Sequence, residues 1–137
     1  MAINVVKINP ITIYEDERGW LAECFRSDNI NITPEMSYFS YTKYNEIRGP
    51  HKHIYQTDFF VFIGPGNFKL YLWDNQPRSK TRGKNIEIIV GESNPVSVIV
   101  PPQIVHGYKS ISKSGSFSIN YPNKLYKGVG KKRQWMK

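Results

Sequence analysis

The sequence predicts a single all-β domain built from antiparallel strands. Its 137 residues are a typical length for one domain. β-Branched and aromatic residues gather in short runs, as they do in strands, and aromatic residues make up 14% of the chain. Turns rich in Gly, Pro and Asn separate these runs, and an extended apolar pattern of helical period is hard to find. Short strands joined by such turns are typical of a β-barrel or β-sandwich.

The expected strands can be placed in order along the chain. The runs Val5–Tyr14 and Trp20–Phe25 flank the polar turn Glu15–Gly19 and therefore predict a hairpin. Polar and aromatic residues alternate over Met36–Tyr44, and the apolar run Asp58–Ile63 ends at a Gly-Pro-Gly turn. The remaining expected strands are Phe68–Trp73, Ile86–Val90, Val96–Val100 and Phe117–Tyr121.

Positive charge is concentrated towards the C-terminus. The formal net charge is +8, yet residues 1–92 contain 11 basic and 11 acidic side chains and are neutral. The remaining residues contain eight basic side chains and no acidic one. A basic surface attracts anions such as a phosphorylated small molecule, whereas a solvated tail is the alternative interpretation. We expect a folded domain over 1–126 and a basic tail over 127–137, with no nucleic-acid partner because no nucleic-acid-binding motif is present.

The sequence also bears on location. No stretch approaches the ~18 consecutive apolar residues of a membrane helix, and the N-terminal residues lack the pattern of a signal peptide. The single cysteine, Cys24, cannot form an internal disulfide. We therefore expect a cytoplasmic protein with no membrane partner.

All three histidines lie in two short segments, Arg48–His53 and Pro101–His106. His51 and His53 are two residues apart, so on a strand their side chains share a face. Asp58 follows five residues after His53, which puts it on the opposite face of a regular strand unless a bulge re-aims it. Imidazoles and a carboxylate can hold a metal ion or transfer protons, so these segments are the candidate site.

The spacing of these residues resembles the two motifs of the cupin barrels, with Asp58 in place of the usual Glu and Gln103 in place of a usual Gly. The resemblance implies a small antiparallel cupin-like (jelly-roll) barrel. Three sequence blocks indicate a particular family of cupin-like proteins. They are D-x-R-G at Asp16–Gly19, R-G-x-H at Arg48–His51 and H-G-Y at His106–Tyr108. In this order they resemble the dTDP-4-dehydrorhamnose 3,5-epimerase family over roughly residues 11–128.

This resemblance implies an isomerase that epimerises carbon next to the ketone of a nucleoside-diphosphate 4-keto-6-deoxyhexose, through an enolate and without a metal or organic cofactor. It implies a role in polysaccharide or glycoside biosynthesis and a homodimer. His51 matches the family's catalytic base, and His53 and Tyr121 are candidate acids. The family uses a carboxylate near the C-terminus to orient the base, but no acid lies beyond Glu92 here, so Asp58 is the candidate for that role. The candidate substrate-binding residues are Arg18, Glu23, Arg48, Gln56, His106 and Tyr126.

Two departures from the family pattern leave alternatives open. The family's lysine aligns with Asp58, and its general-acid tyrosine aligns with Ile119 or, after a shift of two residues, with Tyr121. One alternative is a dTDP-sugar 3,4-ketoisomerase, a related family that shares the R-G-x-H-x-H block of residues 48–53. The others are a non-catalytic sugar- or anion-binding cupin and a metal-dependent cupin that uses His51, His53, Asp58 and His106.

Overall fold

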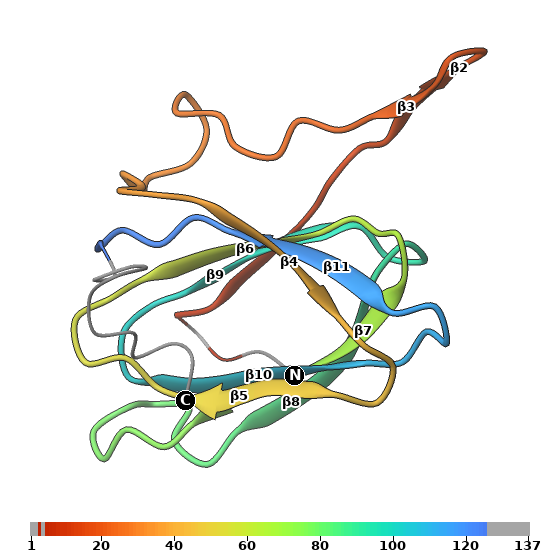
Figure 1. The fold of residues 1–137 in the computed structure, drawn as a ribbon. Helices are drawn as coiled ribbons and strands as arrows, with labels where there is room; N and C mark the ends of the chain where they lie inside the picture. Colours follow the sequence, from red (N-terminus) through yellow and green to blue (C-terminus); the bar gives the residue numbers. More distant parts are fainter. Residues whose placement is uncertain (1–2, 4, 126–137) are drawn as a thin grey trace.

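The computed structural model describes residue 3 and residues 5–125, which form two facing antiparallel sheets and a separate hairpin (Figure 1). The larger sheet has the order β1 (Lys7–Pro10), β9 (Val96–Val100), β6 (Asp58–Phe62), β11 (Ser116–Asn120) and β4 (Tyr38–Thr42). The smaller sheet has the order β5 (Ile47–His51), β10 (Ile104–Ser110), β7 (Asn67–Asp74) and β8 (Asn85–Gly91). The hairpin consists of β2 (Tyr14–Asp16) and β3 (Gly19–Leu21).

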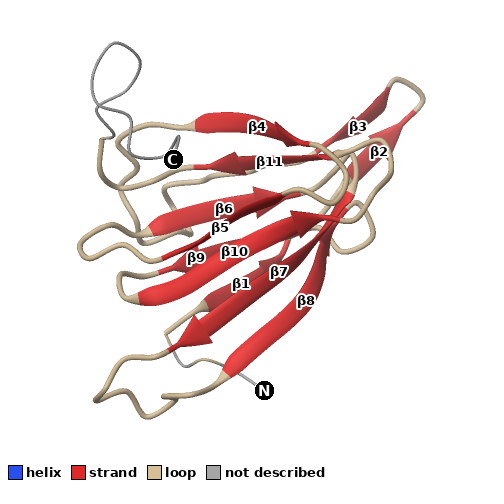
Figure 2. Ribbon diagram, turned by 60° about the horizontal axis from the view of Figure 1, so that its bottom comes forward, coloured by secondary structure: helices blue, strands red, loops and turns tan. Residues whose placement is uncertain are grey.

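Figure 2 shows strands and loops but no helix in this part of the chain, which confirms the predicted all-β domain. It follows that, within residues 3 and 5–125, there is no apolar helix long enough to cross a membrane.

One part of the barrel interior is an apolar core. Along β7, Phe68, Leu70 and Leu72 are buried while the residues between them are more exposed, because successive side chains of a strand point to opposite faces. Strand β6 is buried throughout, since Phe60 belongs to the core and Phe59 is covered on the other face of the sheet. The cover on that face includes Phe25, whose ring centroid lies 6.0 Å from that of Phe59.

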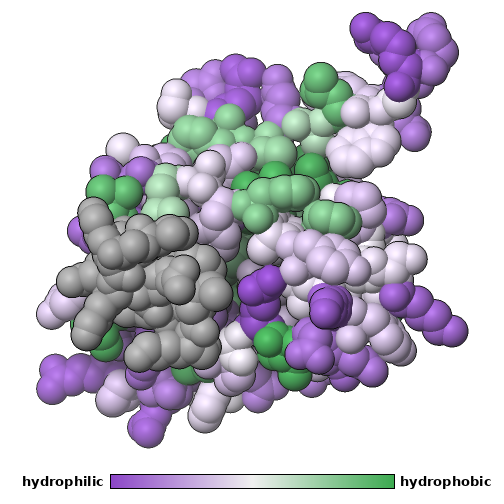
Figure 3. Space-filling view, viewed as in Figure 1, coloured by the Kyte–Doolittle hydropathy of each residue, from purple (hydrophilic) through white to green (hydrophobic). Residues whose placement is uncertain are grey.

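The other part of the interior is polar, because β4 and β11 turn polar side chains inward and aromatic side chains outward. Ser40 and Ser118 face inward with their Oγ atoms 3.2 Å apart. The aromatic residues Phe39 and Tyr41 point outward and pack against Phe117, with centroid distances of 5.4 and 5.0 Å. Figure 3 shows hydrophobic side chains on this face of the molecule and hydrophilic ones at the projecting hairpin. The interior is therefore polar beside β4 and β11 and apolar beside β7.

A bulge in β5 aligns two polar side chains of that strand. His106 of β10 lies opposite His51, and Tyr108 lies opposite Arg48, so three steps along β5 match two along β10. The extra residue brings Arg48 and His51 to the same, inward face. Gly49 lies in the bulge with φ +94°, and a Cβ atom there would lie 2.8 Å from the carbonyl oxygen of His106.

The structure differs from the sequence prediction in several elements. Strand β10, which holds His106, was not expected, and the strand expected to start at His51 instead ends there as β5. The first hairpin is shorter than predicted, and β1 is a separate strand that pairs with β9. Tyr126 and the basic tail over 127–137 lie outside the described residues, so the division at residue 126 stays a prediction.

The bulge generates the first prediction. We expect Gly49→Ala to lower the free energy of unfolding by about 2–4 kcal/mol, because it combines a left-handed backbone with a steric clash. Gly83→Ala is the matched control, since Gly83 also has positive φ (+86°) but open space around its Cβ position. It should cost only about 1–2 kcal/mol. Denaturant unfolding measures both, and equal losses would contradict the role of the bulge.

Candidate active site

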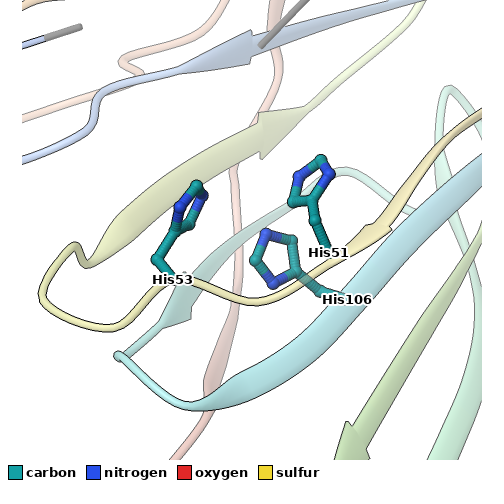
Figure 4. Close-up of side chains that lie close together, drawn as sticks. All are labelled: His51, His53 and His106. Atoms are coloured by element: carbon teal, nitrogen blue, oxygen red, sulfur yellow. The ribbon is translucent and has the colours of Figure 1, made fainter. Parts of the chain in front are cut away.

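The three histidines converge at one end of the barrel (Figure 4). His51 ends β5, His53 belongs to the loop that follows it, and His106 projects from β10. The ring of His51 lies edge-on to that of His106 with a centroid distance of 4.8 Å, and His53 lies 5.5 and 5.6 Å from the other two rings. Residues far apart in sequence thus form one cluster, as the motif spacing predicted.

Asp58 connects this cluster to the larger sheet. Its side chain is only 1% exposed, and Oδ2 lies 3.2 Å from Nε2 of both His53 and His106. Its other oxygen, Oδ1, accepts hydrogen bonds from Nε2 of Gln56 (2.7 Å) and Nδ2 of Asn120 (3.0 Å). A buried carboxylate is unfavourable unless it is paired and hydrogen-bonded, and both conditions hold here.

These contacts keep Asp58 ionised. Burial penalises the charged form, but the contacts from His106 and His53 outweigh it and hold the pKa of the carboxyl well below its usual range. Asp58 does reach the face on which the histidines lie. The reason is that residues 52–57 form an irregular loop instead of a continuous strand, so strand parity from His53 does not apply.

His106 is held between two oxygen atoms. Nδ1 lies 3.0 Å from the backbone oxygen of Ile104, a carbonyl that can only accept, so Nδ1 carries a hydrogen. Nε2 faces the Asp58 carboxylate without forming a well-aligned hydrogen bond within the described chain. The ring is therefore fixed in orientation, and it presents an edge to His51.

His51 has different surroundings, because it lies at the exposed rim of the cluster. Partial burial lowers its pKa to about 4, and the neighbouring His106 and His53 contribute to the shift, while Asp58 opposes it. A group with this pKa is neutral near pH 7. His51 therefore offers an unprotonated imidazole nitrogen to a ligand at neutral pH, which is the state that a general base requires.

Two other predicted site residues lie close to the cluster. The Arg48 guanidinium donates to Oγ1 of Thr42 (2.7 Å) and to the backbone oxygen of Tyr41 (2.8 Å), across the gap between the two sheets. A guanidinium has further N–H groups for an anion. Gln56 binds Asp58 and lies 3.4 Å from Nε2 of His53, so its contacts orient the cluster.

Three predicted residues are not brought to the cluster. Arg18 lies at the turn of the β2–β3 hairpin, where its side chain is 86% exposed and pairs with Asp16. Glu23 is exposed and pairs with Arg26, beside a separate hollow of about 380 Å³ on the outer side of the larger sheet. Tyr121 packs on Phe25 and Phe59 with centroid distances of 5.8 and 5.7 Å. These contacts lie on the opposite face of the sheet from Asp58.

The sequence analysis missed two residues of the site, Asn120 and Tyr38. Asn120 occupies the inward position between Ile119 and Tyr121 and donates to Asp58. The same Nδ2 donates to the hydroxyl of Tyr38 at 3.0 Å. The polar–aromatic alternation over 36–44 was visible, but it did not say which set faces inward.

Comparison with known proteins gives the family. The sequence model of the dTDP-4-dehydrorhamnose 3,5-epimerases matches residues 1–132. The chain belongs to this family. The resemblance predicted from the D-x-R-G, R-G-x-H and H-G-Y blocks is thus confirmed, and so is the class of nucleotide-sugar epimerase.

Individual family relatives support the assignment. The chain is 36% identical over 127 residues to the probable low-salt glycan biosynthesis epimerase Agl13 of Haloferax volcanii, covering 90% of this chain and 81% of that protein. It is 30% identical over 114 residues to the spore coat polysaccharide biosynthesis protein SpsL of Bacillus subtilis, covering 82% and 74%. The crystal structure of the 3,5-epimerase RmlC of Legionella pneumophila in complex with dTDP-4-keto-L-rhamnose superposes with a TM-score of 0.80. The identity is 23%, with 92% of this chain and 70% of that one covered, and the similarity confirms the cupin-like jelly-roll fold.

The cluster has donors that also suit a metal ion. One nitrogen of each histidine lies within 4.8 Å of the others, and imidazoles with a carboxylate are common ligands of Zn and Fe. However, Asp58 already accepts hydrogen bonds from two side-chain amides and lies beside two imidazoles. Both of its carboxylate oxygens therefore have partners within the protein, and we expect the site to hold no metal ion.

The second prediction follows from this network. Elemental analysis of the purified protein should find well below one metal ion per chain, and prolonged treatment with EDTA should leave the activity unchanged. A stoichiometric Fe, Mn, Ni or Zn content that tracks activity across preparations would contradict the prediction.

Proposed function

We propose that this member of the family epimerises a nucleoside-diphosphate 4-keto-6-deoxyhexose at carbon next to the ketone, with His51 as the base. The observation that carries the proposal is the position of His51. Its imidazole is neutral at pH 7, lies at the exposed rim of the polar interior, and has the buried His106–Asp58 pair behind it. A carbon next to a ketone is acidic enough for such a base, because the electron pair left behind forms an enolate.

The buried carboxylate suits the proton-transfer step. When His51 takes a proton, the imidazolium that forms lies close to the negative charge of Asp58, which opposes the repulsion from the other two rings. His51 is therefore neutral before the proton transfer, and its positive charge afterwards is partly balanced by Asp58. Arg48 lies on the same face of the interior and is the side chain best placed there to bind an oxygen anion of the substrate.

Deuterium exchange tests the proposed reaction. The protein is incubated with a dTDP-4-keto-6-deoxyhexose in heavy water, and the label is located by NMR. Label at C3 or C5 together with inversion at that carbon supports the proposal. A ketone that moves to C3 would show the 3,4-ketoisomerase instead, and no exchange would favour a sugar-binding protein without catalysis.

The third prediction concerns His51 directly. His51→Asn keeps hydrogen-bonding capacity but removes the base, so kcat should fall by about 10²–10⁴-fold while dTDP-sugar affinity is retained. His53→Asn should lower kcat less than His51→Asn, because the base is kept and only a contact with Asp58 is lost. Lys52→Ala, an exposed neighbour, is the control for the loop. A wild-type kcat in the folded His51→Asn variant would contradict the assignment.

The fourth prediction is a pH dependence. A base acts when deprotonated, so activity should fall as pH decreases through the pKa of His51. That pKa is about 4, so the acidic limb should lie well below pH 6.5, the value expected for an unperturbed histidine. A pH profile of kcat/KM measures this limb, with circular dichroism at each pH as the control for unfolding. A limb centred near pH 6.5 would contradict the proposed surroundings of His51.

We further infer a homodimer, the assembly that the sequence predicted. Phe39 and Tyr41 are 66% and 45% exposed on the outward face of β4, an edge strand, and they form an aromatic patch with Phe117. Exposed edges and apolar patches of this kind usually meet a partner. The hairpin with Trp20 and Leu21 adds a second exposed apolar surface.

The fifth prediction tests this assembly by sedimentation. Phe39→Glu should shift the protein from dimer to monomer, while Trp73→Glu, an exposed aromatic residue on β7, should not. A monomeric wild type would contradict the inference. The cytoplasmic location expected from the sequence stays a prediction.

A further inference from the structure

Epimerisation requires a second proton donor on the face of the substrate opposite the base. The sequence offered Tyr121, but its ring lies on the outer side of the larger sheet, against Phe25 and Phe59. The inward position beside it is Asn120, an amide that cannot act as a general acid at neutral pH. The donor must therefore be sought among other inward side chains of the larger sheet, which faces the sheet of His51.

Tyr38 is such a side chain. It begins β4 and shares the inward face of that strand with Ser40 and Thr42. Strand β4 leads into β5 through a tight turn, in which the amide of Glu46 donates to the backbone oxygen of Lys43 at 3.0 Å.

The connection between the two strands sets their ends side by side. Next to the turn, Arg48 of β5 donates to Thr42 of β4 at 2.7 Å. Tyr38 lies four residues before Thr42, and His51 lies three residues after Arg48, so both extend away from the turn by roughly 10–13 Å. Tyr38 and His51 therefore lie at the same end of the barrel, on different sheets.

A chain of contacts crosses the interior between them. Nδ2 of Asn120 donates both to the hydroxyl of Tyr38 and to Oδ1 of Asp58, each at 3.0 Å. Oδ2 of Asp58 contacts His106, whose ring packs against that of His51. The hydrogen bond from Asn120 uses the acceptor capacity of the Tyr38 oxygen, not its proton, and it stabilises the phenolate that forms when the proton leaves.

We propose that Tyr38 is the general acid that protonates the substrate from the face opposite His51. This role rests on the proposed epimerase function. His51 takes the proton as the C–H bond next to the ketone breaks, and the electron pair passes into the enolate. The enolate carbon then forms a new C–H bond with the Tyr38 proton on the other face, leaving the Tyr38 phenolate. Water restores a proton to the phenolate and accepts one from His51, so the net change is inversion at one carbon.

A second inward tyrosine, Tyr108, is less suited to this role. It is enclosed by Phe60, Phe62 and Phe68, with centroid distances of 5.0–5.5 Å. Burial, together with the nearby Tyr38, raises the pKa of Tyr108 to about 12. Its ring is part of the apolar core.

The test separates loss of the base from loss of the acid. Tyr38→Phe is compared with the wild type in heavy water, with a dTDP-4-keto-6-deoxyhexose as the probe. Epimer formation should fall about 10²–10⁴-fold. Deuterium exchange with retained configuration should continue within a few-fold of the wild-type rate, because His51 still removes and returns the proton on its own face. Tyr41→Phe, on the outward face of the same strand, is the matched control and should leave both rates unchanged.

The other outcomes overturn the proposal. Wild-type epimerisation by Tyr38→Phe, above all if Tyr121→Phe abolishes it, would place the acid elsewhere. If Tyr38→Phe loses both deuterium exchange and epimerisation but still binds dTDP, Tyr38 acts in the first step instead. No exchange by the wild type would overturn the proposed function, and with it the role of Tyr38.

A second variant covers the case in which Tyr38→Phe does not fold. Replacement of Tyr38 by difluorotyrosine keeps the shape of the ring and lowers the pKa of its hydroxyl. An acid must be protonated to act, so the alkaline limb of the pH–rate profile should move to lower pH. An unchanged alkaline limb would contradict the proposal.

Discussion

The carboxylate of Asp58 is the constraint on which the site depends. It is buried at the start of β6, where an isolated charge would be strongly unfavourable. The structure compensates it from every side: His53 and Gln56 from the loop, His106 from the facing sheet, and Asn120 from the neighbouring strand. Each of these groups is thereby fixed in place, so the requirement to satisfy one charge also orients the residues of the candidate site.

The same network explains how chemically identical side chains acquire different roles. His106 is almost fully buried and held between Asp58 and the backbone of Ile104, whereas His51 lies at the rim with His106 as its neighbour. Burial and the nearby imidazoles lower the pKa of His51, so this accessible ring is neutral near pH 7. The bulge at Gly49 aims this ring and Arg48 into the same space.

The barrel is asymmetric, and this asymmetry serves the site. Strands β6, β7 and β9 contribute a close-packed apolar core that supports the fold. Strands β4 and β11 instead turn serines, Tyr38 and Asn120 inward, and their aromatic residues face outward. Because polar side chains face inward on these strands, less apolar surface is buried within one chain. The exposed aromatic face that results offers apolar area to a second copy of the chain. In this view the polar interior of the candidate site and the proposed dimer surface both result from the residue pattern of β4 and β11.

The sequence by itself determined the all-β class, the family and the meeting of the three histidines, because these depend on composition, motif order and spacing. It did not determine strand parity. The bulge that turns Arg48 and His51 to one face, and the irregular loop that lets Asp58 reach His53, depend on pairing with β10 and on contacts distant in the chain. Likewise, polar and aromatic residues alternate over 36–44, and this pattern is the same whether Tyr38 and Ser40 or Phe39 and Tyr41 face inward. Only the packing of β4 beside β11, across from β5, decided that Tyr38 lies in the interior, while the contacts of Tyr121 lie outside it.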